Sequence, residues 1–485
     1  MPDDAGHSAP PVGAEGVSEA EKSLASDSHD FPLTEGMCLS GWLEGVRHNP
    51  LLDHRTTDAL PSTADYVIIG AGITGSLCAL ELLKTNPGKS VVLLEARELC
   101  SGATGRNAGH CKPDQWRGFT KYAEEHGMDQ SLKILANEQE TWEKLVAYVR
   151  EHKVDCELWV GKTLDVMMTE DCAADAAKTM AAFKAAGGDA SKIEVVTEAF
   201  EAERLSRLKG AKAVYAWDAS TLYPWKLVAH IVEAALDLGL NVQTWTLARE
   251  IQPSESDRKS WRVYTDRGAI TAPVIIHATN AYAGALLPET KHVIRPTPHM
   301  CNRVIPPSSF SGSRALQNSY AVIMPNGLYS INPRLEGDGV ILFGGSAPNQ
   351  QKLMDYVAED PVNRRADDSL MDFEPVTDAV KTLTRDNFGW VDRGQGSRAR
   401  YDYAWSGIIG RSADNLPFIG ALPGKPGQWI CAGHNGHGMA RIFTCAPGLV
   451  KLVNGATWEE TRLPESFEIT TERLDRLREV HGQRN

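Results

Sequence analysis

Three glycines, Gly70, Gly72 and Gly75, carry the first candidate chemistry, because their G-x-G-x-x-G spacing follows an apolar run and opens an apolar helix pattern. The first glycine allows a tight turn, the second lets the backbone approach a pyrophosphate, and the third lets helix and strand pack closely. A helix beginning there, with Ile73 and Thr74 in its first turn, directs unpaired N–H groups at a phosphate. The pattern predicts a dinucleotide-binding turn; a glycine turn without a ligand is the alternative.

An acidic residue supports the same prediction. Glu95 ends the second apolar strand, in KSVVLLEAR, about twenty residues after Gly75. A carboxylate at this offset binds ribose hydroxyls and disfavours a 2′-phosphate, so NADP is not expected. These residues leave NAD and FAD both open.

The elements that position these residues read as a strand, a turn and a helix between Ala64 and Leu83. A small-residue loop, ELCSGATGRNAGHCKP, follows the second strand. Residues from about 130 to 210 read mostly as helices around the strand-like LDVMM, and two later segments have hairpin patterns. The mixture predicts an α/β fold.

Composition limits the class of protein. The 485 residues suit two interleaved domains, and the net charge of −13, from 50 basic and 63 acidic side chains, disfavours nucleic acid or an anionic membrane as a partner. The nine cysteines form no C-x-x-C pair and indicate neither a disulfide framework nor a zinc site. No apolar run is long enough for a bilayer. We expect a cytoplasmic protein without a bound metal.

Three distant motifs resemble one enzyme family. DYVIIGAGITGSLCALELL with VVLLEAR and SGATGRNAGH, then VIIHATNAYAG, then SADNLPFIG with WICAGHNGHGMA resemble the FAD-dependent oxidoreductases related to D-amino-acid oxidase, glycine oxidase and sarcosine oxidase. SGATGRNAGH is most similar to gamma-glutamylputrescine oxidase and to fungal relatives, so a role in secondary metabolism is a possibility. The resemblance runs from about residue 60 to 455 and implies FAD rather than NAD.

The resemblance implies a set of FAD contacts beyond the glycine turn and Glu95. Ala96 and Arg97 would flank the adenine, and Ala248 would meet it through its backbone. The small-residue loop would follow the ribityl chain and ring, a glycine-rich segment would approach the pyrimidine side of the flavin, and the end of a buried strand would lie nearby. These further residues are Ser101, Ala103, Thr104, Asn107, Ala108, Gly109 and His110; Gly433, Asn435, Gly436, Gly438, Met439 and Ala440; and Ala278, Thr279 and Asn280.

The chain departs from its relatives at three positions. Gly407 stands where covalently flavinylated sarcosine oxidases have the attaching cysteine, so noncovalent FAD is expected unless His110 or Cys111 provides another attachment. Ile409 and Ala440 replace the Arg and Lys that bind a substrate carboxylate in glycine oxidase and sarcosine oxidase. We therefore expect a substrate other than a simple alpha-amino acid, although Arg411 or Arg441 could substitute.

Candidate catalytic residues follow from the same motifs. His437 in GHNGHGMA occupies a position that faces the flavin in relatives, where a histidine can take a proton from a substrate amine. Tyr403 and Trp405 alternate along one strand and could hold an amine by cation–π contact; packing in the core is the alternative.

The expected architecture is a discontinuous Rossmann-like FAD-binding domain (61–120, 215–290 and 395–460) and an α+β substrate domain of mixed sheet and helices (121–214 and 291–394). A disordered tail (1–35), an N-terminal arm (36–60) and a C-terminal extension (461–485) complete the chain. The expected reaction is oxidation of a C–N bond in a secondary or acylated amine, by hydride transfer to flavin N5 with O2 as acceptor and H2O2 as product. The alternatives are oxidation of a C–C or C–O bond in natural-product biosynthesis and a non-catalytic FAD-binding role. The sequence predicts no oligomeric state.

Overall fold

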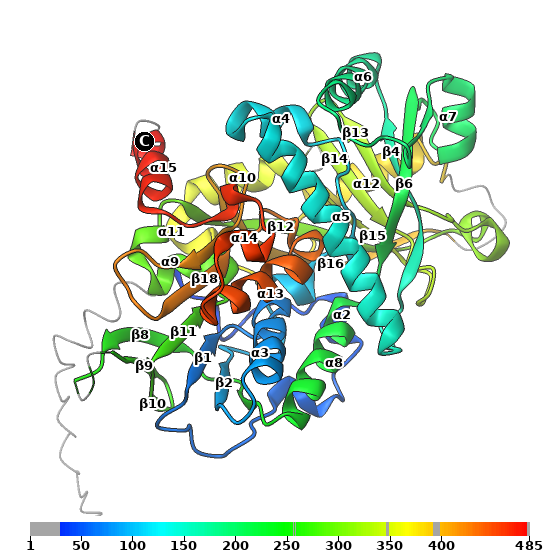
Figure 1. Ribbon diagram of the computed structural model, residues 1–485. Helices are drawn as coiled ribbons and strands as arrows, with labels where there is room; N and C mark the ends of the chain where they lie inside the picture. Colours follow the sequence, from blue (N-terminus) through cyan, green and yellow to red (C-terminus); the bar gives the residue numbers. More distant parts are fainter. Residues whose placement is uncertain (1–29, 256, 258, 346–348, 391–397, 483–485) are drawn as a thin grey trace, which may run out of the picture.

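The computed structural model describes residues 30–255, 257, 259–345, 349–390 and 398–482, which build two large sheets, a small three-stranded sheet and the helices that cover them (Figure 1). The predicted α/β class, with a Rossmann-like unit and a second mixed sheet, is confirmed. Residues 1–29 of the predicted disordered tail lie outside the described part of the chain. No helix within the described ranges has both the length and the apolar composition of a membrane span.

The first sheet contains the glycine turn. Five neighbouring strands run parallel and a sixth, at the edge, is antiparallel. The strand order is β17 (Phe418–Ala421), β18 (Gln428–Ala432), β11 (Val274–His277), β1 (Tyr66–Ile69), β2 (Val91–Leu94) and β7 (Asn241–Gln243). Both faces are covered, which explains why these strands are nearly all apolar.

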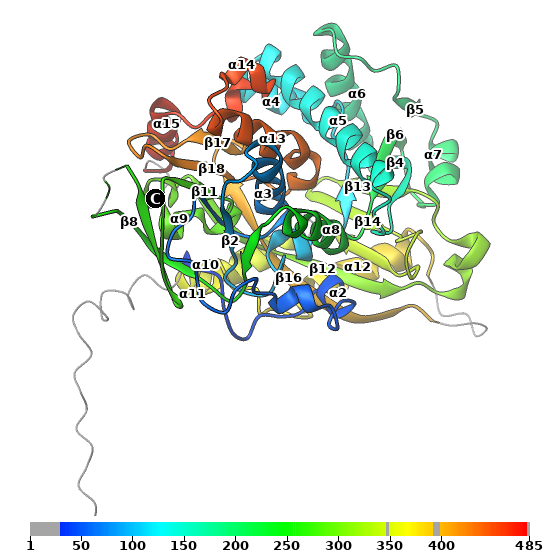
Figure 2. The same cartoon turned by 60° about the horizontal axis from the view of Figure 1, so that its bottom comes forward.

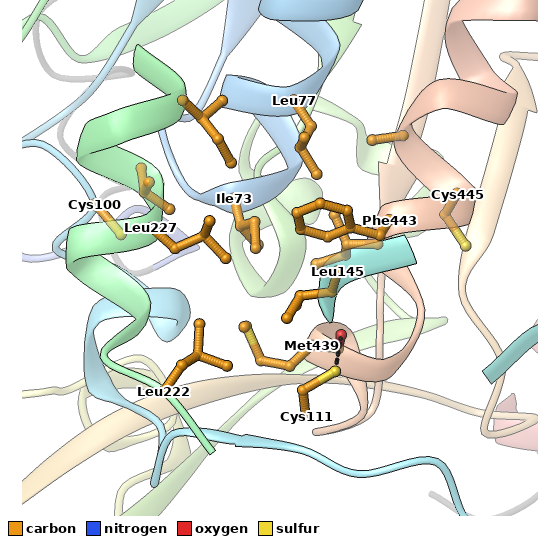
Figure 3. Packing of buried hydrophobic residues seen from close by; sticks show 14 of the residues in the cluster. Ile73, Leu77, Cys100, Cys111, Leu145, Leu222, Leu227, Met439, Phe443 and Cys445 are labelled. Carbon is orange, nitrogen blue, oxygen red and sulfur yellow. Dashed lines mark hydrogen bonds between the residues drawn. The ribbon is translucent and has the colours of Figure 1, made fainter. Parts of the chain in front are cut away.

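Helices cover one face of this sheet. They are α3 (Ile73–Thr85), α8 (Pro224–Asp237) and α13 (Ile442–Val453), with α3 packed between the other two. Ile73 and Leu77 of α3 meet Leu227 of α8 and Phe443 of α13 in the main apolar cluster (Figure 3). On the opposite face, Val67 and its neighbours pack against a small antiparallel sheet of β8 (Ala248–Pro253), β9 (Trp261–Thr265) and β10 (Gly268–Ala272).

The second sheet has nine strands, and two of its long strands come from segments that were predicted to belong to the FAD-binding domain. Its order is β16 (Arg400–Ser412), β12 (Ile294–Ile305), β15 (Ile341–Gly344), β14 (Gly327–Asn332), β13 (Ser319–Met324), β4 (Trp159–Met167), β6 (Ala213–Thr221) and β3 (His110–Cys111), with β5 (Glu194–Val196) beside β6. Most of β6 and all of β16 were predicted within the FAD-binding segments 215–290 and 395–460, but both strands pair in the second sheet. Alternation along a strand does not specify which sheet the strand joins.

The predicted helices between 130 and 210 surround β4, which contains the predicted strand LDVMM up to Met167. The helices of this half are α4 (Phe119–His126), α5 (Met128–Glu151), α6 (Glu170–Ala185), α7 (Ala199–Ser206), α10 (Gln350–Glu359), α11 (Pro361–Arg364) and α12 (Glu374–Asp386). Helix α5 also contacts α13, so it links the two halves of the molecule.

The two ends of the described chain pack on this framework. The arm contains α2 (Gly41–Glu44), labelled in Figure 2, and a short 3-10 helix (Pro50–Asp53), and its Trp42, Leu51 and Leu52 are buried. Asp30, predicted to belong to the disordered tail, is 8% exposed because it pairs with two cations. At the other end, α14 (Trp458–Thr461) leads to α15 (Thr471–Gly482), near the short α9 (Ala283–Leu286).

Candidate active site

A cavity of about 450 Å³ lies between the carboxyl ends of the parallel strands and the second sheet. This edge of an open parallel sheet is where such folds bind ligands. The predicted residues that line the cavity are Gly70, Gly72, Ile73, Thr74, Glu95, Ala96, Arg97, Ala103, Thr104, Asn107, Ala108, His110, Ala248, Ala278, Thr279, Asn280, Gly407, Asn435, Gly436, His437, Gly438, Met439 and Ala440. Sequence segments far apart in the chain therefore meet at one site.

The glycine turn has the geometry that a dinucleotide requires. Gly70 has φ +105°, and a Cβ there would lie 2.7 Å from the carbonyl oxygen of Ala278. Gly72 is the N-cap residue of α3 and has no side chain to cap the helix. The N–H of Ile73 donates to Thr104 Oγ1 at 3.3 Å, and the first turn of the helix faces the cavity. Gly75 lies outside the lining because its role is packing: a Cβ there would lie 1.9 Å from the oxygen of Gly70. These residues fit a bound pyrophosphate.

Glu95 is fixed at the end of β2, where ribose recognition was predicted. Its carboxylate accepts hydrogen bonds from the N–H groups of Ala71 (2.9 Å) and Arg97 (3.1 Å), and it is 9% exposed. Burial raises the pKa of Glu95, and these N–H donors oppose the rise. The guanidinium of Arg97 donates hydrogen bonds to the carboxylate of Asp368 at 2.7 Å and to two backbone oxygens. This side chain is therefore a buried structural cation at the edge of the cavity.

The loop between β2 and β3 lies along the cavity, but three predicted positions support it from outside. Ser101 is buried, and its carbonyl oxygen accepts a hydrogen bond from Arg106 at 2.7 Å. Gly109 packs against the backbone of Leu222, and Gly433 donates its N–H to Asn280 Oδ1 at 3.1 Å. Ser101, Gly109 and Gly433 do not line the cavity themselves.

Attachment of FAD through this loop is disfavoured by the contacts of its two candidate residues. Cys111 is buried, donates to the carbonyl oxygen of Met439 at 3.2 Å (Figure 3), and has its thiol pKa raised by burial. His110 Nε2 lies 3.3 Å from the oxygen of Ile331, and burial lowers the pKa of His110 to about 4. Noncovalent FAD remains our expectation.

Trp405 and Tyr403 were predicted near the substrate, but neither lines the cavity. Trp405 is fully buried, donates from Nε1 to the oxygen of Arg106 at 2.8 Å, and packs against Gly41 of the arm. Tyr403 donates to the oxygen of Leu39 at 2.5 Å. The prediction was wrong because alternation identifies a shared face without saying what covers it, and here the arm covers it (Figure 2).

His437 lies at one end of the cavity beside two carboxylates. Its Nε2 is 3.7 Å from Asp114 Oδ2, its Nδ1 is 3.8 Å from Glu138 Oε1, and its side chain is 29% exposed. Burial lowers the pKa of His437, and the two carboxylates oppose this only in part. The imidazole is therefore neutral and able to accept a proton at neutral pH.

A network of ion pairs surrounds these carboxylates. Arg441 donates to Glu138 at 3.0 Å and to Tyr122 at 2.7 Å, and Arg117 pairs with Asp114. Lys112 and Arg117 both pair with Asp165 of β4. The ligand atoms of Asp114, Glu138 and His437 lie within 4.8 Å of one another, as metal ligands do, but Arg117 and Arg441 already pair with the two carboxylates.

A second charged region lies at the end of β16. Arg411 lines the cavity, and its one hydrogen bond among the described residues goes to the oxygen of Asn435 at 3.4 Å. No carboxylate pairs with it in the described part of the chain, and burial lowers the pKa of Arg411 without removing its charge. His299 of β12 lines the same cavity, and burial lowers its pKa to about 4.

Sequence reasoning missed Asp114, Glu138 and His299 as parts of the site. Asp114 follows the small-residue loop closely enough to have been considered. Glu138 and His299 reach the site from α5 and β12, and no local motif marks them. Gly407, Ile409 and Ala440, the three positions at which the chain is expected to depart from its relatives, all line the cavity.

Comparison with known proteins agrees with this geometry. A family model described as DAO, FAD dependent oxidoreductase, matches residues 65–452. The probable oxidoreductase OrdL of Haemophilus influenzae is 25% identical over 392 residues, covering 78% of this chain and 80% of that protein. Gamma-glutamylputrescine oxidoreductase of Escherichia coli is 24% identical over 399 residues, covering 81% and 84%.

A solved structure is similar as well. Glycine oxidase from Geobacillus kaustophilus superposes with a TM-score of 0.61 at 19% identity, covering 85% of this chain and 99% of that one, which shows a shared fold. Since the family model spans most of the chain, and its glycine turn, Glu95 and cavity fit the cofactor, the protein belongs to the DAO family of FAD-dependent oxidoreductases.

Proposed function

We propose that this enzyme oxidises a C–N bond of an amine that also carries an anionic group, with O2 as electron acceptor. The pairing of a neutral histidine and an uncompensated arginine in one cavity is the observation that carries the proposal. FAD held by the glycine turn and Glu95 would supply a hydride acceptor at N5 and would pass the electrons on to O2, giving H2O2. The imine product then takes up water to release a carbonyl compound and an amine.

His437 serves as the base in this proposal. An ammonium group has no lone pair with which to stabilise the departing hydride, so the substrate must first lose a proton. The neutral imidazole accepts that proton, and Asp114 and Glu138 stabilise the imidazolium that forms. Met439, Ala440 and Ile409 contribute apolar surface to the cavity lining, beside the charged network around His437.

Arg411 serves as the anchor for the anionic group. A buried guanidinium without a counter-ion binds a carboxylate by charge-assisted hydrogen bonds. The usual anchor positions of relatives are apolar here, at Ile409 and Ala440, so we place the carboxylate beside Arg411 and not at those positions. The relative named gamma-glutamylputrescine oxidoreductase supports an acylated amine as the substrate class.

The His437→Gln variant tests the base. We expect kcat/KM at pH 7 to fall about 100-fold, because the amine must then lose its proton to water. The deficit should shrink above about pH 10, where free amines are themselves neutral. In the native enzyme the acidic limb should lie below the ordinary histidine pKa, because burial lowers the pKa of His437. Stopped-flow reduction of the flavin across pH measures both effects.

The exposed His48→Gln variant is the matched control and should behave as the native enzyme. A loss of kcat/KM in His437→Gln that stays constant up to pH 10 would show that this residue does not act as the base.

The Arg411→Met variant tests the anchor. We expect KM for a carboxylate-bearing amine to rise about 30-fold, since a charge-assisted hydrogen bond contributes roughly 1.5–3 kcal/mol, while KM for an uncharged amine stays the same. Arg411→Lys should recover part of the loss for the charged substrate. Steady-state peroxide assays with the two amines make the comparison. Equal losses for both amines would contradict a role in recognising the anion.

A further inference from the structure

We infer that residues 30–33, which precede the predicted arm, form a wall of the cofactor site against the adenosine half of FAD. Phe31 and Pro32 line the same cavity as Glu95 and Ala248. Glu95 is the ribose-recognising acid, and Thr246 donates its N–H to the oxygen of Glu95 at 2.8 Å. This end of the cavity therefore belongs to the adenosine and not to the flavin.

The contacts of Phe31 place its ring beside the strand that closes this end. The guanidinium of Arg249, the residue after Ala248 in β8, lies 5.7 Å from the ring centroid. Phe31, Leu247 and Arg249 also line a smaller hollow on the outer side, so the ring separates the cavity from the surface. An aromatic wall at this position excludes water from an adenine ring and adds apolar contact area.

Ion pairs hold this wall in place. The carboxylate of Asp30 lies 2.7 Å from Lys291 Nζ and also pairs with Arg365, and its side chain is 10% exposed. Leu33 accepts a hydrogen bond through its carbonyl oxygen from Arg97 Nη1 at 3.3 Å. The segment is thus fastened at both ends of Phe31 and Pro32.

The chain then continues along the rest of the cofactor loop. The carbonyl oxygen of Cys38 accepts from Arg106 at 2.8 Å, Ser40 Oγ donates to the oxygen of Gly105 at 2.5 Å, and Trp42 Nε1 donates to the oxygen of Asn107 at 2.6 Å. Residues 30–42, here named the strap, therefore cross the outside of the FAD site from the adenosine end to the loop beside the flavin.

Titration of the apoenzyme tests the inference without reference to turnover. Phe31→Ala should raise the Kd of FAD about tenfold, read from flavin fluorescence, because a buried aromatic wall is lost. The affinity for ADP, used as a competitor of FAD, should fall by the same factor. FMN, which lacks the adenosine, should keep its native affinity in the same competition assay.

The variant Asp30→Asn keeps the Phe31 ring and removes the ion pairs that hold it. This variant should also weaken the binding of both FAD and ADP. Phe200→Ala, at a phenylalanine that is 75% exposed on α7, is the matched control and should change nothing. Unchanged FAD and ADP affinities in both strap variants would overturn the inference. Equal weakening of ADP and FMN would also overturn it, because the segment would then support the fold as a whole and not the adenosine site.

Discussion

The Gly75→Ala variant should be purified without FAD and should unfold at a much lower temperature than the native protein. A Cβ at this position would lie 1.9 Å from the oxygen of Gly70 and 3.3 Å from Ile68. The backbone of Gly70 cannot simply move away, because it already lies close to the backbone of Ala278. The helix α3 would therefore have to separate from β1. We expect a loss of about 3 kcal/mol or more in the free energy of unfolding, at the upper end for overpacking.

The flavin absorbance of the purified protein and its melting temperature measure the two effects. Ser76→Ala is the matched control one residue further along α3, because the buried Ser76 hydroxyl has no hydrogen-bond partner among the described residues. That variant should keep both FAD and stability. A Gly75→Ala protein with native FAD content would mean that the turn tolerates a wider separation of helix and strand than the geometry allows.

The Arg441→Met variant should show the second large effect, a loss of about 3–5 kcal/mol in the free energy of unfolding. Arg441 and Glu138 are both fully buried, with their charged groups 2.9 Å apart. Without the guanidinium, Glu138 keeps one backbone donor, the N–H of Asp114 at 3.0 Å, and an uncompensated charge. Urea unfolding followed by tryptophan fluorescence provides the measurement.

The double variant Glu138→Gln with Arg441→Met tests whether the buried charge causes this loss. Without the carboxylate charge there is no buried anion for the guanidinium to compensate, so the double variant should recover much of the lost stability. No recovery in the double variant would assign the effect to packing instead.

The parts of the site that sequence predicted correctly are local. The turn from Gly70 to Gly75 and the acid at Glu95 lie within one strand–turn–helix–strand unit, whose geometry is dictated by neighbouring residues. That Ile409 and Ala440 replace the carboxylate anchors of relatives stays a prediction from the motifs around them; the structure adds that both residues line the cavity. The same local patterns predicted the α/β class.

The parts that sequence did not predict depend on contacts between distant residues. Glu138 and Arg441 are 303 positions apart, and Arg97 meets Asp368 across 271 positions. The composition of residues 30–35 predicts disorder, yet Asp30 finds two cations from other segments. Trp405 faces the arm instead of the substrate because period-two alternation carries no information about the partner surface.

Strand β16 has a consequence for how this enzyme can be diversified. Ile409 and Arg411, the positions beside the substrate end, stand on the second sheet, whereas the glycine turn and Glu95 stand on the first. Substitutions at 409 and 411 leave the glycine turn and Glu95 unchanged, whereas Gly407 of the same strand lines the cavity at a predicted cofactor position and should be kept. We therefore expect positions 409 and 411, and not the whole strand, to be the useful targets for directed evolution of the substrate range.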